Sequence, residues 1–411
     1  MYYHLSLETY ASADEAFASI PENTTTLSLS GNNLHEKTSA ELYAVLARTP
    51  AHVTQLRLGD NSLWRKTGAN LAQAFSGIPA NVTSLDLSEN TLSKLTGEGL
   101  RQAFSGIPTN VTSLDLSDNQ LRFKTNEQLV DAFSGIPLSV QVLDLSGNRL
   151  CEQEFPIFAI PFDIEGDAFV NVDFEDVIPE VPVFSGIPGS VTTLILRDKG
   201  LYEITAEQIA WALSSIPLTI NVLDLSSCGL WQYSGSQFMH PLVLPETEER
   251  YFHELAQAFA DIPAGVTSLL LQDNELCRIP ADDLIAAFVG IPETVTSIDL
   301  KYNRLFYNKS PDYIDNFLVE LGDVDARLRY DLRNNHAPAC ARTFAQAVVP
   351  LIQMETSGVN EGQRSIPLDV ITNIASCISG LSALNMFQKM APHTVAVSAR
   401  KDREWHDNNQ P

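Results

Sequence analysis

The sequence predicts an α/β solenoid in which short parallel strands alternate with helices. The first observation is a repeated phrase, NVTSLDLS, which begins at Asn81 and recurs 29 residues later at Asn110. The second is an asparagine that follows each phrase, at Asn90 and Asn119. The third is a run with helical spacing that ends in Ile-Pro, as at Ile107. A fixed period of this length indicates a stack of like units, each packed mainly against its neighbours.

The chain divides into a start, an array and an end. Residues 1–21 are predicted to form an N-terminal cap or half repeat, with a short first strand at Leu5-Ser6-Leu7. The array covers residues 22–336. Its steps lengthen after Leu143 and Leu223, which places insertions at residues 151–183 and 231–250. The inward residues of the predicted strands are Leu27, Leu56, Leu85, Leu114, Leu143, Leu194, Leu223, Leu269, Ile298 and Tyr330.

Each unit has a physical logic. Successive side chains of a strand point to opposite faces, so Leu85 and Leu87 should point inwards and Asp86 outwards. An asparagine side chain can donate to and accept from the backbone of neighbouring turns, where a tight bend leaves groups unpaired. Lys199 and Cys228 replace this asparagine in two units, and we interpret Cys228 as structural. The other units have Asn32, Asn61, Asn90, Asn119, Asn148, Asn274, Asn303 and Asn335.

The second half of each unit is predicted to be helical. Threonines precede these segments, and a Glu or Gln lies three residues further on, which is the spacing of a capping box. The pairs are Thr38 with Glu41, Thr125 with Gln128, and Thr205 with Gln208. Ile-Pro then ends the helix. An internal aromatic column is expected from Phe75, Phe104, Phe133, Phe259 and Phe288.

The pattern L-x-L-x-x-N-x-L, as in Leu85 to Leu92, resembles the leucine-rich repeat. The 29-residue step with a helical second half is similar to the ribonuclease-inhibitor-like subclass. This resemblance implies a horseshoe with a parallel sheet on the concave face and helices on the convex face. The near-identical units further resemble the leucine-rich repeat effectors that intracellular bacterial pathogens inject into host cells. The resemblance therefore implies non-enzymatic binding of a host protein.

Composition limits the possible partners. The net charge of −25 over 411 residues argues against nucleic acid and against anionic membranes. The five cysteines include no C-x-x-C pair, which disfavours a disulfide framework or a zinc site. The N-terminus has no basic start or apolar core, and no apolar run approaches the roughly 20 residues of a spanning helix. We expect a soluble protein that reaches the host cytoplasm by a route without a cleaved signal peptide.

Candidate partner-binding residues lie on the predicted concave face. Like charges on adjacent strands, about 4.8 Å apart, repel by roughly 1 kcal/mol even in water. Three consecutive aspartates in the middle column are therefore either a docking face for a basic segment or a hydrated default of the S-L-D-L-S consensus. The concave candidates are Arg57, Asp86, Asp115, Asp144, Ile195, Arg197, Asp224, Leu270 and Asp299.

The insertions are further candidates. The first is acidic, rich in phenylalanine and free of Lys and Arg, so it is either a partner-contacting segment or a local structure folded onto the solenoid edge. The second contains Trp231 and Tyr233, residue types favoured as interface anchors. Both follow a strand and precede a helix, so we expect them on the same rim.

The C-terminal part departs from the repeat. Residues 337–397 are predicted to form a helical cap, which solenoids need at their ends, and residues 398–411 a polar tail. The segment that begins Ile366-Pro367-Leu368 loosely resembles the opening of an F-box. The alternative function is thus a substrate receptor that recruits a ubiquitin-ligase adaptor through residues 366–390. No catalytic, metal-binding or cofactor motif was found, so we predict no enzyme activity and no cofactor.

Overall fold

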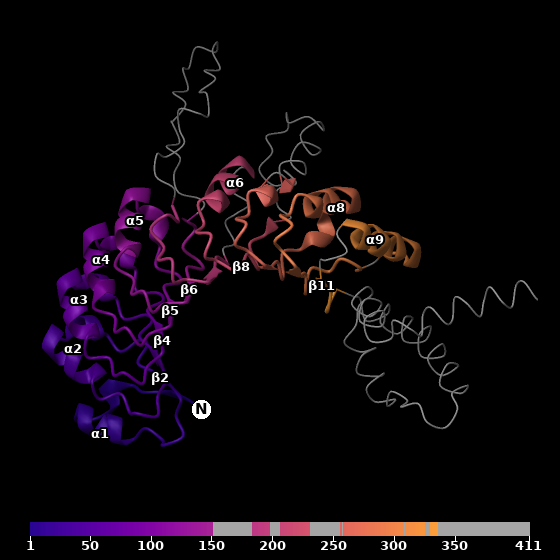
Figure 1. Ribbon diagram of the computed structural model, residues 1–411. Coiled ribbons are helices and arrows are strands. Elements are labelled where there is room, and N and C mark those ends of the chain that lie inside the picture. Colours follow the sequence, from indigo (N-terminus) through magenta and orange to yellow (C-terminus); the bar gives the residue numbers. More distant parts are fainter. Residues whose placement is uncertain are drawn as a thin grey trace, which may run out of the picture.

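The computed structural model describes residues 1–150, 183–197, 206–230, 255–256, 258–307, 309–324 and 329–335. The chain forms an arc with its helices on the outer side and its strands on the inner side (Figure 1). The described residues form eleven strands, which lie in chain order in one parallel sheet. They are β1 (Tyr2–His4), β2 (Thr26–Ser28), β3 (Gln55–Arg57), β4 (Ser84–Asp86), β5 (Ser113–Asp115), β6 (Val142–Asp144), β7 (Thr193–Ile195), β8 (Val222–Asp224), β9 (Ser268–Leu270), β10 (Ser297–Asp299) and β11 (Arg329–Asp331). The predicted α/β solenoid is confirmed.

The strand register agrees with the sequence period. Leu56 pairs with Leu85 and Leu85 with Leu114, and the register continues across both long steps, with Leu143 opposite Leu194. The first strand differs from expectation, because β1 lies at residues 2–4 and Tyr3 pairs with Leu27. Leu5 instead takes the second inward position, where it is 1% exposed. The first unit is therefore shorter than the others, which is why the 29-residue period misplaced its strand.

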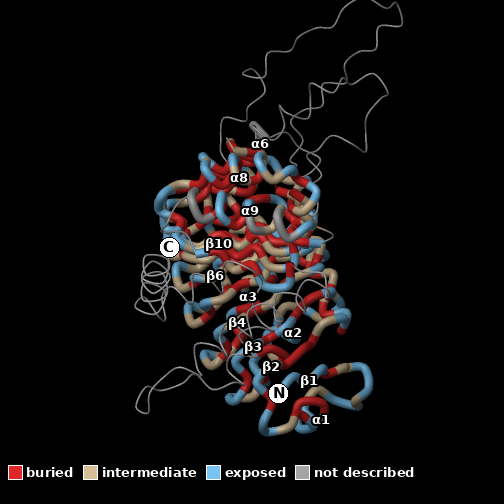
Figure 2. Tube along the Cα trace, turned by 90° about the vertical axis from the view of Figure 1, so that its right-hand side faces the viewer, coloured by how far each residue is buried: buried red, intermediate tan, exposed pale blue. Residues whose placement is uncertain are grey.

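The core is a continuous column between the sheet and the helices. The inward leucines and the predicted phenylalanines are at most 1% exposed, and Phe184 joins this column. Buried residues recur along the whole array, on the strands and on the helices that cover them (Figure 2). Because each unit alone has too little core to fold, this shared burial is what holds neighbouring units together.

Four of the convex helices begin after a threonine, and the predicted caps Thr38 and Thr125 are among them. Thr38 Oγ1 accepts from the Glu41 N–H and the Glu41 carboxylate accepts from the Thr38 N–H, which completes a capping box. Thr125 and Gln128 form the same motif, and the predicted cap at Thr205 lies outside the described residues. The helices are α1 (Ala13–Ala18), α2 (Ser39–Leu46), α3 (Gly68–Phe75), α4 (Gly97–Ser105), α5 (Asn126–Phe133), α6 (Ala206–Ser214), α8 (Ala281–Val289) and α9 (Pro311–Val324).

Short 3-10 helices, which the sequence analysis did not predict, connect strands to helices at one edge of the solenoid. They are η1 (Leu7–Thr9), η2 (Leu34–Glu36), η3 (Leu63–Arg65), η4 (Leu92–Lys94), η5 (Leu121–Phe123) and η10 (Leu276–Arg278). The first leucine of each of η2–η5 is buried, and the residues after it range from buried Ser93 to exposed Phe123. This edge therefore varies from unit to unit, unlike the core.

The buried asparagines form a ladder between units. Asn90 Nδ2 donates to the carbonyl oxygens of Leu58, Leu87 and Ser88 at 3.0 Å, and its Oδ1 accepts from the Asn61 N–H at 3.0 Å. Each amide thus pairs backbone groups of two adjacent turns, as predicted. Cys228 occupies the same place, with its thiol 3.3 Å from the Leu196 carbonyl oxygen, which supports its structural interpretation. Lys199 lies outside the described residues.

The proposed boundaries of the cap, array and tail remain predictions. The insertions after Leu150 and Leu230, the C-terminal segment from residue 337 and the F-box-like stretch all lie outside the described residues.

Candidate functional site

The sheet brings the third residue of each strand into one row along the concave face. Register pairs Arg57 with Asp86, Asp86 with Asp115 and Asp115 with Asp144. The row continues through Ile195, Asp224, Leu270, Asp299 and Asp331. Arg197 follows two residues after Ile195. These candidates therefore share one face, whereas Trp231 and Tyr233 lie outside the described residues.

Three neighbouring aspartates, Asp86, Asp115 and Asp144, form the centre of this row, and we call them the acidic triad. Each carboxylate accepts a hydrogen bond of 2.9 Å from the backbone N–H two residues later, in Ser88, Ser117 and Ser146. These local bonds hold the carboxylates upright on the sheet. Among the described residues, the one cationic group within 4 Å of the triad is Arg57, whose Nε lies 3.9 Å from Asp86 Oδ2.

The middle carboxylate of the triad is electrostatically strained. Burial is the largest influence on Asp115 and raises its pKa, and the charges of Asp144 and Asp86 act in the same direction. Hydrogen bonds from Ser117 oppose this rise without cancelling it. The ionised form of Asp115 is therefore less favourable in the folded protein than in the unfolded chain.

Replacing Asp115 with asparagine should raise the free energy of unfolding at pH 7 by about 1 kcal/mol, because it removes repulsion from two adjacent carboxylates. The pKa of Asp115 is higher in the folded protein than in the unfolded chain. The destabilisation by the ionised carboxylate is therefore complete above the folded-state pKa and absent below the unfolded value of 3.8. The gain should shrink as the pH falls from 7 towards 4, measured by urea denaturation. Asp118→Asn, in the exposed turn of the same unit, should change little. A lower stability of Asp115→Asn at pH 7 would contradict this prediction.

A shallow hollow of about 150 Å³ lies over the acidic triad, between β3 and β7. Its walls include Gln55, Ser84, Ser113 and Val142, which occupy the first position of their strands. These four residues were not among the predicted candidates, which came from the middle and outer columns of the concave face. The signal was present, since alternation also places the first residue of each triplet on the concave face.

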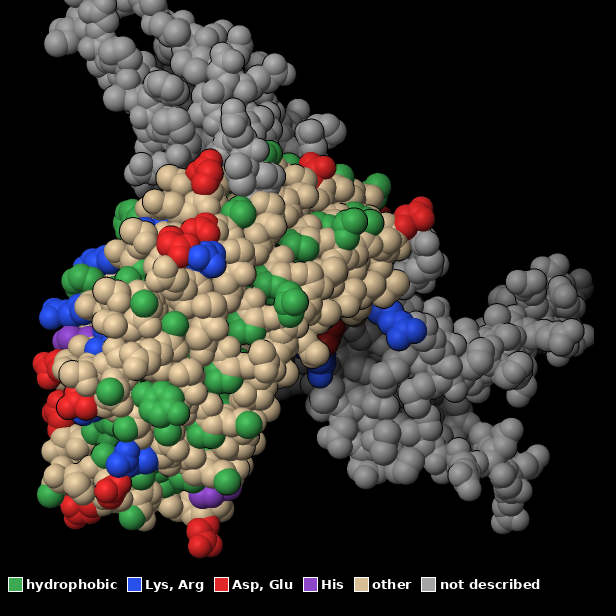
Figure 3. Space-filling view, turned by 60° about the vertical axis from the view of Figure 1, so that its left-hand side comes forward, with side chains coloured by type: hydrophobic (Ala, Val, Ile, Leu, Met, Phe, Trp, Pro, Cys, Tyr) green, Lys and Arg blue, Asp and Glu red, His purple; other side chains and the backbone are tan. Residues whose placement is uncertain are grey.

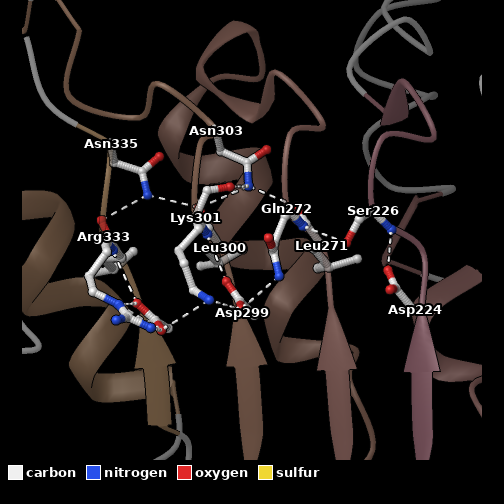
Figure 4. A network of polar contacts seen from close by, with 12 residues as sticks. Asp224, Ser226, Leu271, Gln272, Asp299, Leu300, Lys301, Asn303, Arg333 and Asn335 are labelled. Carbon is white, nitrogen blue, oxygen red and sulfur yellow. Dashed lines mark hydrogen bonds and ion pairs between the residues drawn. The ribbon is translucent and has the colours of Figure 1, made fainter. Parts of the chain in front are cut away.

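The C-terminal half of the concave face is different, because its aspartates are paired with cations (Figure 4). Lys301 Nζ lies 2.6 Å from Asp299 Oδ2 and 3.6 Å from Asp331 Oδ2. Arg333 contacts Asp331 at 2.6 Å, and Gln272 donates to Asp299 at 2.9 Å. Burial would raise the pKa of Asp331, but the hydrogen bonds and charge of Arg333, with the charge of Lys301, lower it overall.

Arg197 marks the border between the two halves. Its guanidinium contacts Asp224 at 2.7 Å, and the Asp224 side chain is only 2% exposed. The hydrogen bond from Arg197 to Asp224 raises the pKa of the guanidinium. Half-buried Ile195 and Leu270 lie on either side of Asp224 in the row. The concave face is thus acidic between Arg57 and Arg197 and charge-balanced beyond.

Other parts of the described surface show fewer features of a binding site. On the outer face turned to the viewer in Figure 3, hydrophobic side chains are scattered rather than gathered in one patch. The part of the chain that the structure describes contains no group of His, Cys, Asp and Glu side chains suited to a metal ion. Within the same ranges, no helix has the length and apolar character to cross a membrane.

A strand, a turn held by a buried asparagine and a convex helix, repeated along a curved parallel sheet, define a leucine-rich repeat protein. No protein-family model and no curated protein matches the sequence. Among solved structures, the leucine-rich repeat-containing protein LegL7 from Legionella pneumophila matches with a TM-score of 0.61 and 30% sequence identity. The match covers 80% of this chain and 89% of that chain, and the chain belongs to the leucine-rich repeat proteins.

Proposed function

We propose that this chain is a non-enzymatic protein-interaction module that binds a basic segment of a host protein on its concave face. The observation that carries the proposal is the acidic triad. Its three carboxylates lie side by side, and among the described residues only Arg57 brings a cationic group within 4 Å of them, whereas the aspartates from β8 onwards are paired. A leucine-rich repeat solenoid offers an extended concave surface suited to such a partner.

A lysine- or arginine-rich segment fits this surface for two reasons. It would relieve the repulsion among the three carboxylates, and such complementarity speeds encounter and fixes register. The adjacent Val142 and Ile195 are half-buried and could accept an apolar side chain next to the cations. Apolar anchors beside charged groups are the usual source of affinity, because solvent-exposed ion pairs contribute little alone.

The proposal includes a cellular role and a second contact region. The Legionella origin of the matching structure supports a bacterial effector that acts in the host cytoplasm after export without a cleaved signal peptide. The insertion with Trp231 and Tyr233 would add specificity at the edge of the face. The alternative, recruitment of a ubiquitin-ligase adaptor through residues 366–390, concerns residues outside the described ranges and gains no support from the rest.

The test is a pull-down from host-cell lysate with the full chain, read by mass spectrometry. The variant Asp86→Asn/Asp115→Asn/Asp144→Asn should lose at least about tenfold of the captured partner, since each charge-assisted contact contributes up to roughly a factor of ten. The matched control Asp60→Asn/Glu89→Gln/Asp118→Asn removes the same charge from exposed turns of neighbouring units and should retain it. Trp231→Ala/Tyr233→Ala should also weaken capture. Equal capture by the triad variant and its control would contradict the role of the concave face.

A further inference from the structure

The concave face between β4 and β7 is an open sheet surface on which charged and apolar groups follow one another. Among the described residues, helices cover only the outer side of the arc, and the strands face its inner side (Figure 1). The row of the acidic triad continues into Ile195, which register places opposite Asp144. Ile195 is half-buried and therefore offers an apolar contact in line with three carboxylates. This order favours a partner that brings cations and an apolar side chain in the same sequence.

Two arginines limit this surface at its ends. Arg57 lies opposite Asp86 in the row, and its side chain is 49% exposed. At the other end, the side chain of Arg197 is 52% exposed, although it contacts Asp224. A cation of the partner placed over either arginine would be repelled. The surface that accepts cations and an apolar group therefore extends over the four strands β4–β7.

The spacing of these strands selects the conformation of the partner. The four row positions lie about 4.8 Å apart, so the last is about 14.4 Å from the first. In an α-helix, residues i, i+3, i+7 and i+10 share one face and lie at about 4.5, 10.5 and 15 Å from the first. Residues on one face of an extended strand are about 6.7 Å apart, so the fourth lies at about 20 Å. The helix alone keeps all four side chains within about 1 Å of the row.

The width of the surface leads to the same conformation. The hollow over the acidic triad is also lined by Ser84, Ser113 and Val142, which form a second column at the first position of their strands. Two residues of strand separate the columns, which is about 6.7 Å. A helix about 10 Å wide contacts both columns, whereas one extended chain occupies about 4.8 Å. The second column is uncharged, so it suits the neutral flank of a helix whose cations form one stripe.

We propose that the partner segment is an amphipathic α-helix that lies across β4–β7. Its cations at i, i+3 and i+7 pair with Asp86, Asp115 and Asp144, and an apolar residue at i+10 packs against Ile195 and Val142. This inference rests on the proposed function and adds the conformation of the partner and the register of its contacts. It excludes basic segments that bind in an extended form.

The test titrates the full chain into three fluorescently labelled peptides and measures their anisotropy. The first is an alanine-rich helix of eighteen residues with lysines at positions 4, 7 and 11 and a leucine at position 14. The second has the same composition, with the lysines at positions 4, 6 and 8 and the leucine at position 10. The third is the first with a proline at position 9. All three carry the same charge, so general attraction to a chain of net charge −25 is matched.

The first peptide should bind at least about tenfold more tightly than either of the others, since each misplaced charge-assisted contact costs up to roughly a factor of ten. The triad variant described above should lose this affinity at least about tenfold, and its matched control should retain it. Ile195→Thr should weaken binding about fourfold, the factor for roughly one buried CH₂ group. Replacing the peptide's leucine with alanine should not add to that loss, because both changes remove one contact.

The outcomes separate this inference from the proposed function. Equal affinities of the first and second peptides, both dependent on the acidic triad, would leave the binding of a basic segment in place and overturn the helix. Equal affinities of the first peptide and its proline form would do the same. If none of the peptides bound the full chain, or if the triad variant bound as tightly as its control, the inference and the proposed function would both fail.

Discussion

Replacing Asn119 with leucine should lower the free energy of unfolding by about 4 kcal/mol. Asn119 is completely buried, and its Oδ1 accepts from the N–H groups of Asn90 and Leu92 at 3.0 and 3.2 Å. Its Nδ2 donates to the carbonyl oxygens of Leu87, Leu116 and Ser117. Leucine has nearly the same shape but leaves these groups without partners, at a cost of roughly 1–3 kcal/mol for each group that cannot find another.

The matched control is Asn119→Cys, because a cysteine already occupies this place in the unit of Cys228. One thiol can replace only part of the amide's bonds, so the cysteine variant should lie between the wild type and the leucine variant. Urea denaturation gives the free energies, and amide hydrogen exchange in β4–β6 shows whether the loss is local. Equal stabilities of the two variants, or a loss below about 1 kcal/mol for leucine, would show that the ladder contributes little.

Much of this fold could be predicted because its core follows a strict period. The inward leucines fixed the strand register, and the threonine caps fixed the starts of α2 and α5. The strand of the short first unit was not predicted correctly, because Tyr3 rather than a leucine is opposite Leu27. The 3-10 helices were not predicted either, since three residues are too few to show a periodic pattern.

Some of the repeated glycines could be explained only by packing. A Cβ on Gly106 would lie 2.4 Å from the carbonyl oxygen of Ala72 in the preceding helix, and one on Gly135 would lie 2.2 Å from that of Arg101. The glycine in the repeated phrase AFSGIP therefore permits close approach of adjacent helices, in addition to helping the chain leave the helix. Such a contact joins positions more than 30 residues apart, so no local pattern indicates it.

The order of the residues along the concave face could be predicted from the sequence, but the pairing of its aspartates with cations could not. Alternation placed Asp86, Asp115 and Asp144 in one row, as the register shows. Whether an aspartate is paired depends on the reach of a long side chain from the next column, as with Lys301, which spans Asp299 and Asp331. Rotamers of Lys and Arg are set by their three-dimensional surroundings, so the contrast between the two halves emerged only from the structure.

Replacing Arg197 with methionine should lower the free energy of unfolding by about 3 kcal/mol, because it leaves a buried carboxylate without its cation. Arg197 contacts Asp224 through Nη2 at 2.7 Å and through Nε at 2.8 Å. With Asp224 2% exposed, water cannot replace the guanidinium, and one backbone hydrogen bond from Ser226 remains. Methionine keeps most of the aliphatic length, so the change concerns mainly charge and hydrogen bonding.

Two further variants separate this effect from lost packing. Arg197→Met/Asp224→Asn removes both charges and should recover about half of the loss, since breaking one partner of a buried pair is more costly than removing the pair. Arg48→Met breaks a comparable 2.7 Å contact with Asp14, whose side chain is 81% exposed, and should cost less than about 1 kcal/mol. Equal losses for Arg48→Met and Arg197→Met, measured by urea denaturation, would contradict the argument. The expected difference would mean that Arg197 stabilises the fold because its partner Asp224 is buried, whereas an ion pair of the same length with an exposed carboxylate contributes little.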